Sequence, residues 1–128
     1  MRLVEHVVEW RPGEFARATR VARADDWFFD GHFPHAPVVP AIVLVELLAQ
    51  TGGLAAAANY GHDAPLQLRV AAFGAFKFPG AAEPGATLEA RARVIGTFGD
   101  LIRIEGDVTA DGNVVAAGSI TLAKPRTR

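Results

Sequence analysis

The stretch that decides the fold is residues 31–53, which read GHFPHAPVVPAIVLVELLAQTGG. Its prolines hold the first part extended, and Pro40 suits the first turn of a helix, where its missing N–H needs no partner. From residue 41 to residue 50 the only polar side chains are Glu46 and Gln50. A helix without a polar face is typical of one that other structure covers all round. We therefore expect this helix to be buried on every side.

A membrane-spanning helix is the competing interpretation of the same run. Glu46, Gln50 and the pair Gly52 and Gly53 interrupt it before about 20 apolar residues have accumulated, which is the length that a bilayer requires. After the glycines, residues 54–59 continue the helix with alanines that allow close packing. The pattern favours one long central helix in a small globular domain, and we expect no association with a membrane.

Glu46 is the first candidate functional residue, because a buried carboxylate loses the hydration that its charge needs. One explanation is structural: Gln50 lies four residues further on, on the same helical face, and can hydrogen-bond to it. The other is catalytic, since a glutamic acid in apolar surroundings can hold a proton near neutral pH and donate it to a substrate. The residues alone leave both explanations open.

His32 is the second candidate. A single histidine beside Phe33 is more often a half-buried structural side chain than a catalyst, but His32 lies just before the predicted helix start, in a loop whose prolines fix its position. With His35 it also forms an H-x-x-H pair near the acids of residues 24–30. Phe33 and Pro34 leave no helical face that would align the two imidazoles, so we expect no metal site.

The string G-H-F-P-x-x-P-x-x-P, followed by V-E-x-x-A-Q in the helix, resembles the signature of the 3-hydroxyacyl-acyl carrier protein dehydratases of the hot-dog fold. The spacing of fourteen positions from His32 to Glu46 also matches that family. The similarity continues weakly through residues 76–79 and 84–85. It implies an α+β protein with the hot-dog fold, in which an antiparallel sheet of about six strands wraps round one long central helix.

The same resemblance implies roles for individual residues. His32 would be the base that removes the C2 proton of a 3-hydroxyacyl thioester, and Glu46 the acid that protonates the departing hydroxide at C3. The backbone N–H of Ala41, at the positive end of the helix, would hold the thioester oxygen, although the family usually has glycine there. Gln50 would support the acid. The substrate-binding positions would be Phe33, Phe73, Gly74 and Phe76.

The implied activity is conversion of a (3R)-hydroxyacyl thioester to the trans-2-enoyl thioester in fatty acid, polyketide or aryl polyene biosynthesis, without a cofactor. Basic residues at this position attract the acidic carrier protein, and this chain has Ala75 and Phe78 where the family often has arginines. The resemblance therefore leaves two carriers open, acyl carrier protein and coenzyme A. The alternatives are a hot-dog acyl thioesterase and a non-catalytic acyl-binding subunit. The resemblance further implies a homodimer joined edge to edge, or a trimer of such dimers, with the two catalytic groups of one site on different subunits.

The length, charge and composition of the chain also limit which functions are possible. The length of 128 residues predicts a single domain over residues 1–128. A formal net charge of −1 gives no electrostatic signature for binding nucleic acid. The absence of cysteine excludes disulfides, thiolate metal ligands and a cysteine nucleophile. Glu5 and Glu9 interrupt the apolar residues that follow Arg2, so we expect no signal peptide and a cytoplasmic location.

The remaining sequence predicts β-structure. Residues 88–94 and 102–108 alternate between apolar and charged side chains, which is typical of strands with one buried face. Asp111 and Gly112 predict a hairpin turn into a strand over residues 113–122. Further expectations are strands over residues 3–10, 15–22 and 66–78, a bulge or close approach at Gly74, and a loop at residues 24–30 whose aromatic side chains plug the edge of the core.

Overall fold

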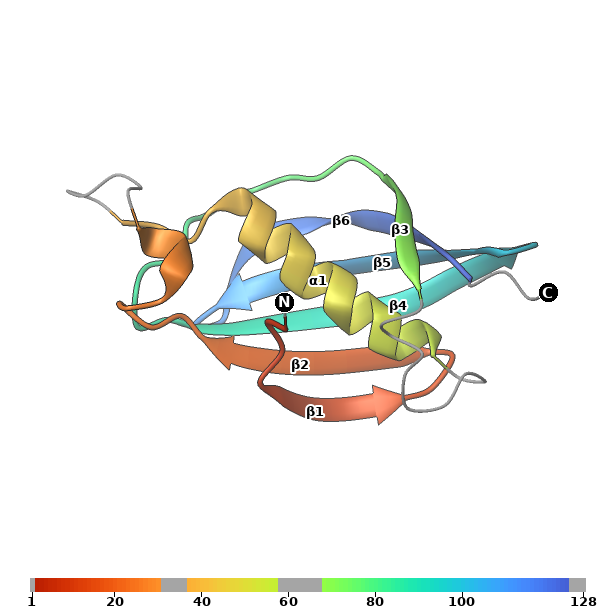
Figure 1. The fold of residues 1–128 in the computed structure, drawn as a ribbon, viewed down its shortest axis with the longest axis horizontal. Coiled ribbons are helices and arrows are strands. Elements are labelled where there is room, and N and C mark those ends of the chain that lie inside the picture. The colour runs from red at the N-terminus through yellow and green to blue at the C-terminus, as the bar shows by residue number, and fades with distance from the viewer. Residues whose placement is uncertain (1, 31–36, 58–67, 125–128) are drawn as a thin grey trace.

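The structure is a computed structural model that describes residues 2–30, 37–57 and 68–124 (Figure 1). Two strands precede the main helix and four follow it, as the sequence predicts. The elements in chain order are β1 (His6–Arg11), β2 (Phe15–Val21), the 3-10 helix η1 (Trp27–Phe29), α1 (Ala41–Ala56), β3 (Arg69–Phe73), β4 (Thr87–Phe98), β5 (Leu101–Ala110) and β6 (Asn113–Ala123).

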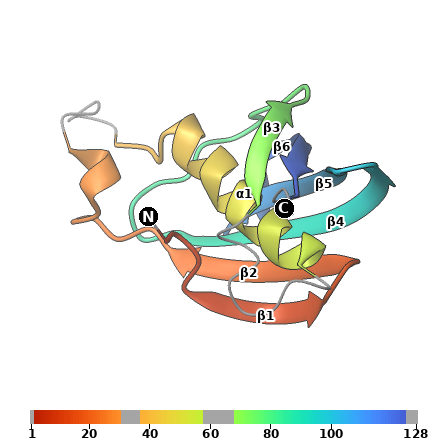
Figure 2. The ribbon, with the colours of Figure 1, turned by 45° about the vertical axis from the view of Figure 1, so that its right-hand side comes forward.

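The strands form one antiparallel sheet in the order β1-β2-β4-β5-β6-β3. Consecutive strands β4, β5 and β6 are joined by short turns, whereas β1 and β3 form the two edges. The sheet curves along one side of α1, which crosses its concave face (Figures 1 and 2). An antiparallel sheet wrapped round one long helix confirms the predicted α+β hot-dog architecture.

The hairpin β1–β2 completes the C-terminal end of α1. The Trp10 indole N–H donates to the carbonyl oxygen of Leu54 at 2.7 Å, and the Gly13 N–H donates to that of Ala55 at 2.7 Å. The last carbonyls of a helix have no partner within it, so this hairpin satisfies acceptors that would otherwise need water. The helix therefore ends where the β1–β2 turn meets it.

Small residues on the sheet let α1 approach closely. A Cβ atom added at Gly106 would overlap the Arg91 carbonyl oxygen and lie 2.9 Å from Leu48 Cδ1. Leu48 itself is fully buried. The short side chains beneath the helix allow its leucines to pack directly on the strands, and this contact forms the core. Alanines supply much of that surface, namely Ala16, Ala18, Ala90 and Ala92.

The prediction that α1 is buried on every side is wrong for a single chain. Ile42 is 76% exposed, and Ala41 and Glu46 are exposed as well. The sheet is one layer and covers only the side of the helix that faces it (Figure 1). The uniform apolar run therefore signals burial on one side by the sheet, and leaves an apolar stripe on the other.

The strand predicted over residues 66–78 is shorter in the structure. Its described part ends at Phe73, after which only Lys77 pairs again, with Ala117. Gly74 still donates its N–H to the Ser119 carbonyl oxygen at 2.8 Å, and a Cβ at Gly74 would overlap the Ser119 hydroxyl. The close approach predicted at this glycine is thus confirmed. The predicted helix extension over residues 54–59 stops at Ala56, and residues 58 and 59 lie outside the described part of the chain.

The predicted hairpin turn is confirmed, and so is the burial of two of the three aromatic side chains in the loop before α1. Asp111 and Gly112 both have positive φ, at 48° and 89°, which is the conformation of a two-residue type I′ hairpin turn. Phe28 and Phe29 of η1 are buried at the edge of the core, as expected of the loop aromatics. Trp27 is 53% exposed and does not share that role.

Candidate active site

Helix α1 places Glu46 and Gln50 one turn apart on its outer side. Gln50 Nε2 lies 3.5 Å from Glu46 Oε1, so the predicted contact between them exists, at the long end of hydrogen-bond distances. The accompanying expectation, that apolar surroundings enclose Glu46, is wrong for one chain, because its side chain is exposed. Ile42 occupies the same stripe one turn earlier. Enclosure of this carboxyl group therefore needs something beyond the described residues of a single protomer.

Gln50 is held by the N-terminal segment. Its Oε1 accepts hydrogen bonds from the Leu3 N–H at 2.7 Å and from the Val4 N–H at 3.3 Å. Two donors on one side fix the carbonyl end of the amide, so the NH₂ end points toward Glu46. No sequence pattern indicates this arrangement, because the donors are backbone N–H groups 46 and 47 residues away, and such groups are the same in nearly every residue.

Ala41 is the first residue of α1 and follows Pro40. The N–H groups of the first helical turn have no acceptor within the helix and lie at its positive end. The lead-in is fixed from the opposite side, since the Val39 N–H donates to the carbonyl oxygen of Ala82 at 2.8 Å. A donor at Ala41 is thus available on an exposed helix start. His32 and Phe33 lie outside the described residues, and their roles stay predictions.

Phe73 and Phe76, two of the predicted substrate-binding residues, form an aromatic row with Phe78. The ring centroids of Phe73 and Phe76 lie 6.3 Å apart, and those of Phe76 and Phe78 lie 6.0 Å apart. Phe76 packs partly against the core, while Phe73 is 56% exposed. Strand β3, which carries Phe73, pairs with β6 and forms one edge of the sheet. The row therefore extends the apolar surface at this edge of the sheet.

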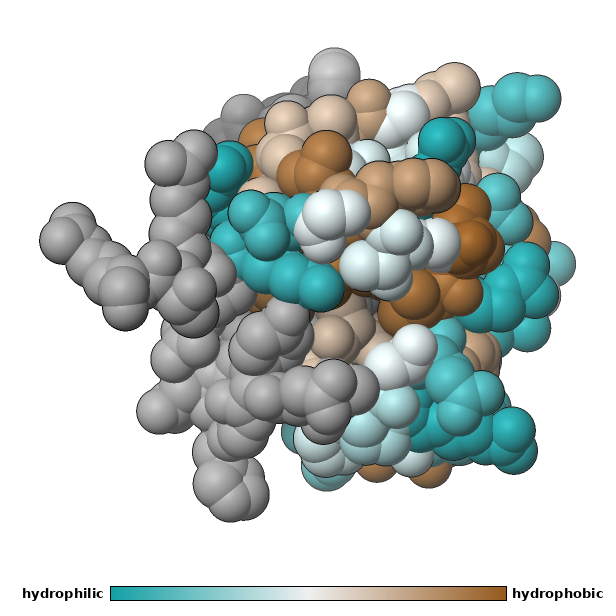
Figure 3. All heavy atoms as spheres, turned by 90° about the vertical axis from the view of Figure 1, so that its right-hand side faces the viewer, coloured by the Kyte–Doolittle hydropathy of each residue, from teal (hydrophilic) through white to brown (hydrophobic). Residues whose placement is uncertain are grey.

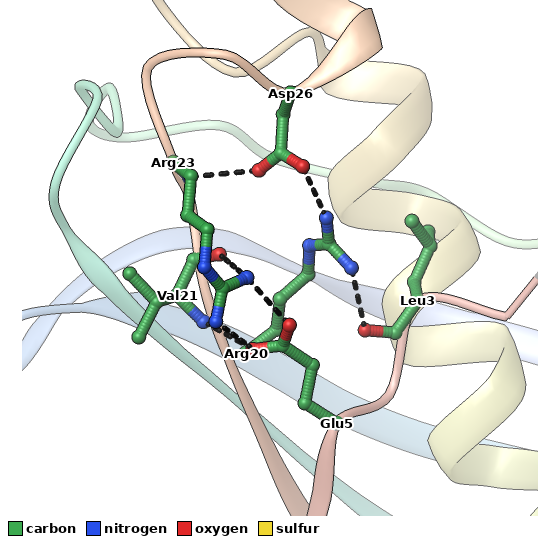
Figure 4. A network of polar contacts seen from close by, with 6 residues as sticks. All are labelled: Leu3, Glu5, Arg20, Val21, Arg23 and Asp26. Carbon is green, nitrogen blue, oxygen red and sulfur yellow. Dashed lines mark hydrogen bonds and ion pairs between the residues drawn. The ribbon is translucent and has the colours of Figure 1, made fainter.

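A polar network ties the segment before the site to β2 (Figure 4). Arg20 Nη2 donates to Asp26 Oδ1 at 2.6 Å, and Arg20 Nη1 donates to the Leu3 carbonyl oxygen at 3.3 Å. The guanidinium carbon of Arg20 lies 5.5 Å from the centre of the Phe28 ring. The sequence does contain a signal here, because Arg20 occupies the core-facing register of β2 between Ala18 and Ala22.

Glu5 and Arg23 form the exposed part of the same network. Arg23 Nη1 and Nη2 donate to the two Glu5 oxygens at 2.5 and 3.2 Å, and the Val21 N–H donates to Glu5 Oε1 at 3.1 Å. These bonds favour the ionised carboxylate, so the Arg23 bond and then the Val21 bond lower the pKa of Glu5, while burial opposes them. The same pair raises the pKa of Arg23.

A depression of about 690 Å³ lies on the outer face of the sheet, away from α1. None of the predicted site residues in the described part of the chain lines it. Arg91 and Asp107 at its rim form a two-pronged ion pair with both N···O distances at 3.0 Å, which raises the pKa of Arg91.

Within the described residues, no three His, Cys, Asp or Glu side chains are placed to hold a metal ion. Among the described helices, none has the length and apolar character needed to cross a bilayer.

Comparison with known proteins places the chain in a family. The FabA-like domain family matches residues 1–119. The 3-hydroxyacyl-[acyl-carrier-protein] dehydratase FabZ of Ruminiclostridium cellulolyticum is 33% identical over 121 residues, which cover 94% of this chain and 84% of that protein. The FabZ of Bacillus subtilis is 32% identical, with coverages of 94% and 85%.

Solved structures share the fold at low sequence identity. The dehydratase heterocomplex ApeI:P from Xenorhabdus doucetiae has a TM-score of 0.76 at 15% identity, over 98% of this chain and 84% of that one. A mutant of the phenylacetic acid degradation protein PaaI from Thermus thermophilus has a TM-score of 0.71 at 20% identity, with coverages of 95% and 94%. These likenesses establish the fold, and the sequence relatives establish the lineage. The chain therefore belongs to the FabA-like family and is a relative of the FabZ 3-hydroxyacyl-[acyl-carrier-protein] dehydratases.

Proposed function

We propose that this protein is a hydro-lyase of fatty acid biosynthesis that converts a 3-hydroxyacyl thioester on acyl carrier protein to the trans-2-enoyl thioester. The observation that carries the proposal is the match of 94% of the chain, at 33% identity, to a protein named 3-hydroxyacyl-[acyl-carrier-protein] dehydratase. The chain also has the acid and base candidates that the reaction needs, Glu46 and His32. These two assignments are part of the proposal.

The chemistry divides between a base and an acid. His32, as neutral imidazole, takes the proton from C2, and the electron pair of that C–H bond becomes the new C2–C3 double bond as the C3–O bond breaks. Glu46 delivers a proton to the departing oxygen, which leaves as water. The net change is loss of one water molecule from the substrate, with no oxidation or reduction.

Two further groups assist this step. Negative charge builds on the thioester oxygen while the C2 proton leaves, and the Ala41 N–H at the start of α1 is an N–H donor that could stabilise it. Gln50 donates to Glu46 Oε1, so Oε2 is the oxygen that would carry the transferable proton. Phe33, Phe73, Gly74 and Phe76 remain the proposed contacts for the acyl chain.

A second copy of the chain would complete the site. Glu46 is exposed in one protomer, and Ile42 on the same stripe is 76% exposed, so this side of α1 presents an apolar side chain beside the candidate acid. Strand β3 is a sheet edge whose backbone groups can pair with another strand. We infer that two protomers join at this side, which encloses Glu46 and brings it to the partner's His32. A cytoplasmic location belongs to the same proposal.

The carrier is recognised by charge in this proposal. Lys77 and Arg69 are exposed cations near the β3 edge, and they would attract an acidic carrier protein. Ala75 and Phe78 add no charge there, so the attraction is weaker than arginines would provide. Turnover with acyl carrier protein and with coenzyme A thioesters, measured side by side, decides which carrier this chain uses.

Incubation of the purified protein with a 3-hydroxyacyl-acyl carrier protein tests the reaction. We expect enoyl thioester absorbance to rise, with no release of free thiol. His32→Ala and Glu46→Gln should each lower kcat by about 10²–10⁴-fold, the range that a general acid or base contributes.

Matched controls are His6→Ala and Glu83→Gln, which change exposed residues of the same types on β1 and in the turn before β4. Both should retain wild-type turnover. Release of free thiol without enoyl product would instead identify a thioesterase. Acyl binding by the wild type, with the same background activity in all variants, would identify a non-catalytic subunit.

A further inference from the structure

Arg20 occupies a position that an apolar side chain could fill. It lies on the core-facing side of β2, opposite Leu88 of β4, and its side chain is only 10% exposed. Asp26, its ion-pair partner, is 13% exposed. Burying such a pair removes both charges from water, and apolar replacements of buried pairs are often as stable or more so. The Arg20 Nε atom is buried and has no hydrogen-bond partner among the described residues, which adds to this cost.

The guanidinium group is oriented on several sides. Asp26 accepts from Nη2 and fixes one prong of the fork, and the same carboxylate accepts from the Arg23 N–H at 2.7 Å. The Phe28 ring lies 5.5 Å from the guanidinium carbon. Because the guanidinium is planar, fixing one prong also fixes the direction of the other, Nη1. That second prong reaches the Leu3 carbonyl oxygen (Figure 4).

Leu3 connects the guanidinium group of Arg20 to Gln50, which contacts the candidate acid Glu46. Its carbonyl oxygen accepts from Arg20, while its own N–H donates to Gln50 Oε1 at 2.7 Å. The Leu3 side chain is 2% exposed, so the residue is anchored in the core as well. Gln50 in turn directs its NH₂ group to Glu46 Oε1. A continuous series of contacts thus runs from Asp26 through Arg20, Leu3 and Gln50 to Glu46.

We propose that Arg20 is a positioning residue for the dehydration, which sets through Leu3 which end of the Gln50 amide faces Glu46 and hence which carboxyl oxygen carries the transferable proton. This inference rests on the proposed function of Glu46. Without the Arg20 bond, residues 3 and 4 can shift and the Gln50 amide can turn over, presenting its oxygen to the carboxyl group. That oxygen would accept a hydrogen bond from the protonated acid and so hold the proton that the departing hydroxide needs.

A double-mutant cycle on kcat tests the proposal. Arg20→Gln should lower kcat by about 10-fold to 100-fold with KM nearly unchanged, since misplacing a catalytic group by about 1 Å has an effect of that size. Gln50→Ala should lower kcat similarly, and adding Arg20→Gln to it should lower kcat no further, because the two residues act in series. Arg20→Lys keeps the charge but not the fork, and should lie between wild type and Arg20→Gln.

The matched control is Arg91→Gln, which breaks a two-pronged pair with Asp107 on the outer face of the sheet. It should keep the wild-type kcat. The melting temperature of each variant is measured first. The assays are then run well below it, so that a lower kcat does not reflect unfolding. A wild-type kcat for Arg20→Gln, or losses that multiply in the double variant, would overturn the proposal and leave Arg20 a structural residue.

Amide hydrogen exchange decides the contact series independently of turnover. Exchange of the Leu3 and Val4 amides should be slow in the wild type and at least about 10-fold faster in Arg20→Gln, as expected when a local opening becomes easier. Exchange that stays unchanged would refute the link. If the wild type fails to dehydrate any hydroxyacyl thioester, the proposed function fails, while this exchange result still shows whether Arg20 orders residues 3 and 4.

Discussion

Glu5 shows how a single carboxylate ties the N-terminal segment to β2. The Arg23 hydrogen bond, followed by the Val21 N–H, holds the pKa of Glu5 below its ordinary value. A lowered pKa in the folded state means stability that is present above the unfolded value and is lost as pH falls through the folded value. Acid should therefore loosen this segment, and with it the backbone groups that hold Gln50.

Glu5→Gln should melt at a lower temperature than the wild type at pH 7, because the substitution removes the charged partner of Arg23. Below about pH 4 the two melting curves should converge, since the wild-type carboxylate is then losing its charge too. The effect should be small, because Arg23 is half exposed and water screens the pair. Glu14→Gln, in the β1–β2 turn, is the control, and a pH-independent difference between Glu5→Gln and wild type would contradict this account.

The contact of α1 with the sheet depends on the missing side chain at Gly106. An added methyl group would overlap the Arg91 carbonyl oxygen and press on Leu48, and neither atom can move without displacing β4 or the helix. Gly106→Ala should therefore destabilise the protein by about 1–3 kcal/mol, the usual range for overpacking a core.

Chemical denaturation of Gly106→Ala and wild type measures this difference. Gly96→Ala is the matched control, because an added Cβ there meets only the ring of Phe98, which is 68% exposed and free to turn away. Equal losses of stability in the two variants would show that the helix does not rest on Gly106. The same comparison tests why α1 can lie so near the sheet.

The whole molecule presents several apolar side chains to solvent. Hydrophobic groups alternate with hydrophilic ones on the end of the molecule that carries the β4–β5 turn (Figure 3). Ile42 of α1 and Phe73 of β3, at 76% and 56% exposed, lie on the side where we infer the second protomer. Covering these two side chains and Glu46 would bury apolar area and isolate the acid from water in the same event.

Mixing two inactive variants tests whether one site contains residues of two chains. His32→Ala and Glu46→Gln, unfolded together and refolded, should regain about a quarter of the wild-type activity, because half of randomly assorted dimers are mixed and each has one intact site. Each variant refolded alone supplies the background. No recovery in the mixture, with mixed dimers demonstrated by mass, would place both groups of a site on one chain.

The sequence by itself determined the place of the main helix and the number and order of the strands. Residues 41–56 are helical because an apolar run follows a proline, and β4, β5 and β6 follow from alternation and from the Asp111–Gly112 turn. The contact of Glu46 with Gln50 was also predictable, since residues four apart share a helical face. All of these depend on local spacing, which a sequence displays directly.

Only the tertiary structure decided which side of α1 stays open, where β3 ends, and how Gln50 is oriented. An apolar run predicts that a helix is shielded from water. It does not predict whether the sheet or a second protomer covers each side of the helix. The donors that fix Gln50 are backbone N–H groups of Leu3 and Val4, and every residue except proline has one. Such contacts join positions far apart in the chain through groups without sequence identity, so their geometry exists only once the sheet has closed round the helix.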